Sequence, residues 1–162
     1  MAVVLYFDHS QGQTTGNTVV VAEKIAALTE SQLVPLKAEK SYPEDYQTLL
    51  QVTKAEATNQ ARPEIIPLAL DWSKANTLFL GYPIWWGRFP RAVATFLENT
   101  DLSGKTIYPF CTHEGSRLGQ SVTELQQLCP QSTIQTGLPV RGSKVQQSDQ
   151  AIKNWLAQMT VN

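Results

Sequence analysis

The sequence predicts an α/β fold: a doubly wound, five-stranded parallel sheet with helices on both faces. Short apolar runs alternate with amphipathic stretches along the whole chain, which is the order of repeated strand–helix units. The first apolar run, residues 3–7, is continuous and contains β-branched side chains, as in a strand covered on both faces. No repeat or low-complexity tract interrupts this alternation, so residues 1–162 are expected to form a single domain.

Five segments are expected to be strands, and two prolines bear on their places in the sheet. The strands are residues 3–7, 32–36, 77–80, 106–110 and, more weakly, 132–136. Pro35 predicts a sheet edge for the second strand, because proline cannot donate a ladder hydrogen bond. Pro109 would cost the fourth strand such a bond unless it lies near the end of that strand.

Apolar residues at helical spacing occur between and after these strands. The stripes consist of Val21, Ile25 and Leu28; of Val93, Phe96 and Leu97; of Leu118, Val122, Leu125 and Leu128; and of Ile152, Trp155, Leu156 and Met159. Residues 46–61 permit a helix but have only a weak apolar pattern. Pro90 stands where a helix could start.

Composition excludes several classes of function. The 13 Lys and Arg almost balance the 14 Asp and Glu, which is unlike the basic surface of a nucleic-acid binder. Cys111 and Cys129 cannot form a disulfide framework, and no His/Cys cluster has zinc-ligand spacing. The longest apolar stretch is broken by Gly81 and Pro83, and no signal peptide is visible. We therefore expect a cytoplasmic protein without a nucleic-acid, membrane or metal partner.

The loops that follow the strands are the places to search for a site, because ligands of parallel α/β sheets bind beyond the carboxyl ends of the strands. Residues 8–18 offer hydroxyls, glycines and an amide before a helix N-terminus, which suits an anion. No Lys or Arg occurs among them, and Asn17 stands where a Walker A loop has its lysine. An ordinary turn that caps a helix would explain these residues equally well.

The next two loops carry aromatic and polar side chains. Trp85 and Trp86 are adjacent in a loop, where a planar aromatic ligand would explain them better than core packing. A subunit interface or a small satellite core is the alternative. The loop of residues 111–119 adds backbone amides, hydroxyls and His113, although a lone loop histidine is more often solvated.

Several stretches form a more specific set. They are residues 15–18 (T-G-N-T), 42–46 (Y-P-E-D-Y), 61–63 (A-R-P), 81–87 (G-Y-P-I-W-W-G), 95–98 (T-F-L-E) and 109–113 (P-F-C-T-H). Together they resemble a bacterial flavodoxin-like family that carries the Y-P-I-W-W-G motif, and the first resembles the phosphate loop of flavodoxins. The resemblance covers nearly the whole chain.

This resemblance implies strand order 2-1-3-4-5 and non-covalently bound FMN. It places Thr15, Asn17 and Thr18 on the phosphate and Trp85, Trp86 and Gly87 along the isoalloxazine ring. The loop after the first strand is longer than is usual in the family, and Gln13 stands where the phosphate loop usually has its first hydroxyl. Ser10 could supply that hydroxyl instead. No catalytic residue is predicted. The predicted cofactor-binding residues are Ser10, Thr15, Gly16, Asn17, Thr18, Pro83, Ile84, Trp85, Trp86, Gly87, Thr112, His113, Gly115, Ser116 and Gly119.

The resulting hypothesis is an FMN-binding redox protein that transfers electrons to a partner protein or a small-molecule acceptor. The alternative is an NAD(P)H-dependent FMN reductase that acts on quinones or similar acceptors. The near-neutral charge disfavours a carrier, and the lack of an obvious nicotinamide-binding segment disfavours the enzyme. Two finer expectations are that His113 affects the flavin as it protonates near its ordinary pKa, and that Trp85 rather than Trp86 stacks on the ring.

A phosphorylatable receiver domain has the same topology and is excluded. It needs an aspartate after the third strand, where this chain has Gly81 and Tyr82, and Asp8 has no acidic neighbour. An interaction module without a cofactor remains an alternative. The sequence leaves the oligomeric state open.

Overall fold

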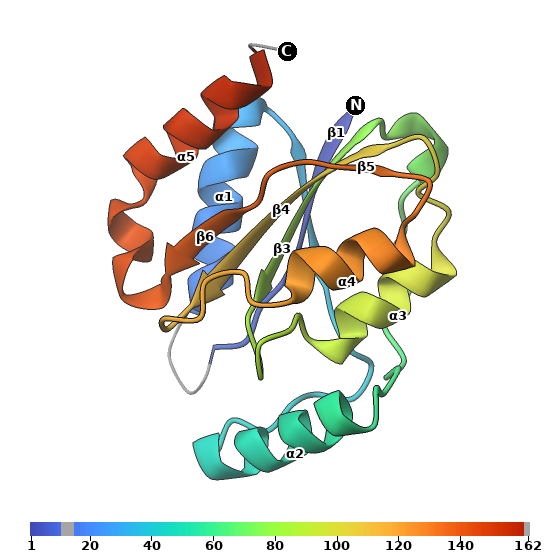
Figure 1. Ribbon diagram of the computed structural model, residues 1–162, viewed down its shortest axis with the longest axis vertical. Coiled ribbons are helices and arrows are strands. Elements are labelled where there is room, and N and C mark those ends of the chain that lie inside the picture. Colours follow the sequence, from blue (N-terminus) through green and yellow to red (C-terminus); the bar gives the residue numbers. More distant parts are fainter. Residues whose placement is uncertain (11–14, 161–162) are drawn as a thin grey trace.

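A parallel sheet forms the centre of the computed structural model, which describes residues 1–10 and 15–160 (Figure 1). The strand order is β2-β1-β3-β4-β5, and β6 also pairs with β4. The predicted order and the edge position of the second strand are therefore confirmed. The strands are β1 (Ala2–Phe7), β2 (Gln32–Leu36), β3 (Thr77–Pro83), β4 (Thr106–His113), β5 (Thr133–Ile134) and β6 (Leu138–Arg141).

The last predicted strand differs from the observed one. In place of a strand over residues 132–136, β5 has only two residues, and β6 continues the pairing with β4 after an interruption. Pro109 lies in the interior of β4, not near its end. The N–H of Gln135 donates to the Ile107 carbonyl, so odd-numbered residues of β4 face this interrupted side. Pro109 is one of these residues, so the N–H that proline lacks would have pointed to the gap between β5 and β6.

Helices cover both faces of the sheet, as predicted. The helices are α1 (Asn17–Thr29), α2 (Tyr46–Thr58), α3 (Arg91–Asn99), α4 (Ser121–Leu128) and α5 (Asp149–Ala157), with short 3₁₀ turns η1 (Trp72–Lys74), η2 (Gly142–Gln147) and η3 (Gln158–Thr160). In Figure 1, α1 and α5 lie on one face and α3 and α4 on the other. None of the helices described is long and apolar enough to cross a membrane.

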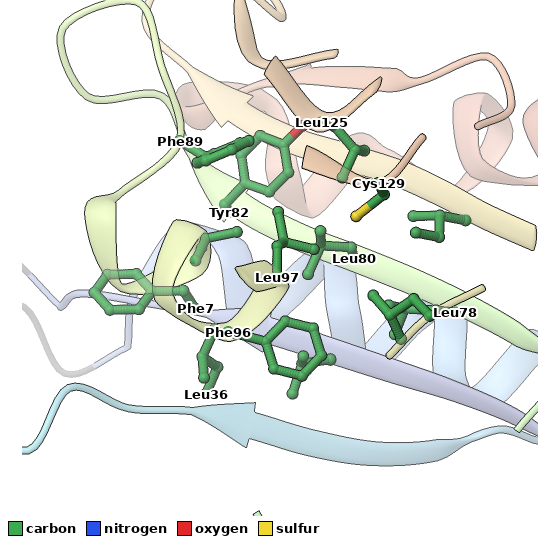
Figure 2. Packing of buried hydrophobic residues seen from close by; sticks show 14 of the residues in the cluster. Phe7, Leu36, Leu78, Leu80, Tyr82, Phe89, Phe96, Leu97, Leu125 and Cys129 are labelled. Carbon is green, nitrogen blue, oxygen red and sulfur yellow. The ribbon is translucent and has the colours of Figure 1, made fainter. Parts of the chain in front are cut away.

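Alternation along the strands divides the core into two clusters. Val3 and Leu5 of β1 pack on the side of α3 and α4, and Val4 packs on the side of α1 and α5. Figure 2 shows the first cluster, in which Phe96 and Leu97 of α3 lie over the strands.

Helix α2 differs from the others because it lies beyond the carboxyl ends of the strands (Figure 1). Its buried residues are Leu49 and Thr53. A helix that buries so little has no need of a full apolar stripe, which explains its weak sequence pattern.

Gly81 allows one close contact in the centre of the sheet. It is the register partner of Phe110 on β4, and a Cβ at this position would overlap the Phe110 ring. We expect Gly81→Ala to lower the free energy of unfolding by about 1–3 kcal/mol, the usual cost of overpacking. Denaturant titration measures the change. In a Phe110→Leu background the same alanine should cost less, and equal costs in both backgrounds would contradict this contact.

Candidate functional site

Two adjoining hollows lie where β1, β3 and β4 end. They share Asn17, Pro83 and Thr112, and the last two are register partners on neighbouring strands. The smaller hollow is lined by Asp8, His9, Ser10, Gly16, Asn17, Thr18, Pro83 and Thr112. The larger one, with a volume of about 380 Å³, is lined by Asn17, Pro83, Ile84, Trp85, Thr112, His113, Glu114, Gly115 and Ser116. Most of the predicted cofactor-binding residues thus surround one continuous region.

The remaining predicted residues lie elsewhere. Thr15 is exposed, and Trp86, Gly87 and Gly119 are not among the residues that line either hollow. Gln13 lies outside the described residues. A Cβ at Gly119 would overlap the Gly87 carbonyl, so this glycine permits a close approach of two backbones beneath the turn that carries Trp86.

A buried hydroxyl pair joins the first helix to the end of β4. Thr18 Oγ1 and Thr112 Oγ1 lie 2.8 Å apart, and both side chains are buried. The hydrogen bond fixes the N-terminal turn of α1 against the strand end that continues into His113. This contact lies in the wall of the smaller hollow and holds it beside the larger one without a ligand.

A carboxylate lies against the N-terminus of α1, which the sequence did not reveal. Asp8 Oδ1 accepts a hydrogen bond from the Val19 N–H at 3.2 Å, and a Cβ at Gly16 would overlap the carboxylate. Burial raises the pKa of Asp8, although hydrogen bonds from the backbone of Val19 and Thr18 act in the opposite direction. The lining of this hollow, as far as the structure describes it, contains no Lys or Arg.

The two tryptophans belong to a tight hairpin turn of residues 85–88. Trp85 and Arg88 exchange backbone hydrogen bonds of 2.8 and 3.2 Å. Trp86 and Gly87 between them have φ values of 57° and 76°, as the central residues of a type I′ hairpin turn require. Glycine adopts this conformation freely, whereas tryptophan is strained in it.

This turn directs the indoles to different places. Trp85 lines the larger hollow, with its ring centroid 5.4 Å from that of Phe7 and 5.3 Å from that of Tyr42. Trp86 is 47% exposed and donates from Nε1 to Thr53 Oγ1 on α2 at 2.9 Å.

Two arginines and a glutamate anchor the turn. Arg88 and Arg91 each donate two hydrogen bonds to the Glu124 carboxylate, the shortest being 2.6 Å. Arg88 also donates to the Ala57 carbonyl of α2. Burial would raise the pKa of Glu124, but the hydrogen bonds from Arg91 and Arg88 outweigh it and hold the pKa below its ordinary value. This cluster could not be predicted from the sequence, because more than thirty positions separate Glu124 from either arginine.

His113 is buried at the end of β4, and its Nδ1 accepts a hydrogen bond from the Gly115 N–H at 2.9 Å. Burial, with added repulsion from Arg141 and Arg117, lowers the pKa of His113. The expectation that it protonates near its ordinary pKa is therefore wrong. The ring is neutral at neutral pH and carries its proton on Nε2.

Cys111 is a buried thiol at the end of β4. Burial raises the pKa of Cys111 to about 12, so its thiol stays protonated, in agreement with a small apolar residue at the strand end. No group of three or more metal-ligating side chains occurs in residues 1–10 and 15–160.

Comparison with known proteins identifies relatives over almost the full length. The sequence model of the flavodoxin family matches residues 2–159. A candidate flavoprotein from Bacteroides eggerthii is 30% identical, with a TM-score of 0.83 over 99% of this chain and 98% of that one. A second, from Bacteroides uniformis, is 26% identical, with a TM-score of 0.82 over 96% and 97%.

A more distant structure contains a flavin. The flavoprotein from Lactobacillus acidophilus in complex with FMN is 21% identical, with a TM-score of 0.71 over 90% of this chain and 96% of that one. No curated protein shows significant sequence similarity to the chain.

The Glu124 cluster generates a prediction about stability. Glu124→Ala would leave Arg91, which is 2% exposed, without its carboxylate, and should cost about 3–5 kcal/mol of unfolding free energy. Because the pKa of Glu124 is lowered in the folded state, its contribution is present above its unfolded pKa and is lost as pH falls through the folded one. Unfolding curves from neutral to acid pH measure both effects.

The more exposed pair of Glu98 with half-buried Arg62 is the matched control. Glu98→Ala should cost under about 1 kcal/mol. Equal losses for the two variants would contradict an anchoring role for Glu124.

Proposed function

Because the chain belongs to the flavodoxin family, we propose that it binds FMN non-covalently and acts as a redox protein. The observation that carries the proposal is the junction of the two hollows. A polar hollow at the start of α1 and an aromatic one beside Trp85 share Asn17 and Thr112. FMN combines a polar ribityl phosphate with a flat ring, so its two parts match the two hollows. The family and the neighbour solved with FMN support this cofactor.

The residues present fit such a ligand. The larger hollow lies within the 300–1,000 Å³ that small-molecule sites usually have. Trp85 provides an aromatic wall for the ring, and the Nε2 proton of His113 is a neutral hydrogen-bond donor. Ser10, Gly16 and Asn17 would lie along the ribityl phosphate.

When bound, FMN would supply the electron-transfer chemistry, and the protein would supply position and electrostatics. Neutral His113 would offer the ligand a hydrogen bond but no charge of its own. The anchored turn of residues 85–88 fixes Trp85, so one face of the site is formed before a ligand binds. Preformed walls reduce the ordering cost of binding.

A specific observation favours the enzyme as the second candidate. A third hollow of about 360 Å³ shares Asp8, His9 and Ser10 with the polar hollow. Lys37 and Lys40 contribute to its lining. A small acceptor or part of a nicotinamide cofactor could enter it next to the flavin. A net charge of −1 gives a carrier little electrostatic attraction for a partner protein.

The two tryptophans test the ring site. We expect Trp85→Phe to recover part of the FMN fluorescence that binding quenches and to weaken FMN binding by about 0.5–1.5 kcal/mol, because the stacked indole is lost. Trp86→Phe is the matched control, since it removes the Nε1 bond to Thr53 but no wall of the hollow. Fluorescence titration of both variants is the measurement. Recovery with Trp86→Phe alone, or with neither, would place the flavin elsewhere.

Stopped-flow mixing separates the two redox functions. The FMN-loaded protein is mixed with NADH or NADPH without oxygen, and flavin absorbance is followed. Rapid bleaching would establish the reductase, whereas a carrier should bleach slowly with either nucleotide and quickly with a reducing protein. Protein that takes up neither FMN nor riboflavin would overturn the proposed function.

A further inference from the structure

We propose that Asp8 competes with the phosphate of FMN for the N-terminus of α1, so that the cofactor binds tightly only when this carboxylate is protonated or displaced. The inference rests on the proposed function. It concerns a side chain of this protein that limits the affinity and sets the pH dependence of flavin binding.

The contact geometry is the first support. The Asp8 carboxylate accepts the Val19 N–H, one of the free donors of the first turn of α1, and lies directly against Gly16. A phosphate at a helix N-terminus uses the same backbone donors and the same end of the helix dipole. Both anions therefore need one position. Gly16 is the residue that leaves room for Asp8, since any side chain there would overlap the carboxylate.

The surrounding charges are the second support. On β1, Tyr6 faces Asp8, and His9 follows it; α1 has no acidic residue in its first turn. Glu44 accepts a hydrogen bond from Ser10 at 3.1 Å, which adds a second carboxylate nearby. The neighbouring hollow that Asp8 also lines contains Lys37, Glu39, Lys40 and Glu44. Two carboxylates offset these two lysines, and the polar hollow itself has no described lysine or arginine to neutralise both Asp8 and a phosphate.

Burial determines how the competition responds to pH. It raises the pKa of Asp8, so the carboxylate becomes neutral at a higher pH than an exposed aspartate. As pH falls towards this raised pKa, repulsion of the phosphate should fade and FMN should gain affinity relative to riboflavin. The phosphate's own second ionisation, near pH 6, also changes this repulsion, so the decisive comparison of wild type and variant is made at about pH 8, where the phosphate is a dianion in both.

The test is the ratio of the riboflavin Kd to the FMN Kd, measured by fluorescence titration for wild type and Asp8→Asn. Asparagine keeps the acceptor for Val19 N–H and removes the charge. At about pH 8 the ratio should rise about tenfold or more in the variant, and the two proteins should converge as pH falls through the raised pKa of Asp8. Asp149→Asn removes an equal charge at the start of α5, where Asp149 pairs with Lys24, and should leave the ratio unchanged.

Each outcome decides the inference. An unchanged ratio in Asp8→Asn overturns the inference. This includes equal weakening of FMN and riboflavin binding through a damaged helix cap, because a purely structural role of Asp8 would affect the two flavins equally. A lower ratio overturns it too and makes Asp8 a ligand-supporting residue. Binding of neither flavin by the wild type overturns the proposed function itself. Calorimetry in buffers of different ionisation enthalpy gives a second readout: wild type should take up more protons than Asp8→Asn when FMN binds.

Discussion

Parallel pairing of β1, β3 and β4 is the constraint on which the site depends. It brings the carboxyl ends of three strands, and the starts of the helices that follow them, to one edge of the sheet. Every backbone donor that a helix start leaves free must be satisfied there. The Asp8–Val19 hydrogen bond satisfies one of these donors, and the Thr18–Thr112 hydroxyl pair joins the helix start to the end of β4.

The turn of residues 85–88 shows how a strained segment is maintained at this edge. Trp86 has a backbone conformation that disfavours a large side chain, and Arg91 is a buried cation. Both costs are offset by one carboxylate, because Glu124 binds Arg91 and also Arg88 within the turn. Helix α2 adds to the support through its contacts with Trp86 and Arg88, although it lies away from both faces of the sheet.

The fold could be predicted because its signals are local. Continuous apolar runs mark strands covered on both faces, and Pro35 marks the edge. The interior place of Pro109 could not be predicted, since it depends on which neighbour its missing N–H would face. In the site, sequence order identified the three loops but not their contacts. The direction of Trp85 could not be predicted because it follows from the type I′ turn. The contact of Asp8 with α1 could not be predicted because it joins residues that are eleven positions apart.

Glu124 and Asp8 show why the electrostatics of such a site cannot be derived from residue types. Both are partly buried carboxylates, and desolvation raises the pKa of each. Two guanidinium groups reverse the effect at Glu124, whereas only backbone donors and His9 oppose it at Asp8. Burial acts on His113 in the opposite direction and also favours its neutral form. The edge of the sheet thus stabilises the charged carboxylate of Glu124, where two arginines converge, and favours the neutral forms of Asp8 and His113. Any phosphorylated ligand would meet this environment.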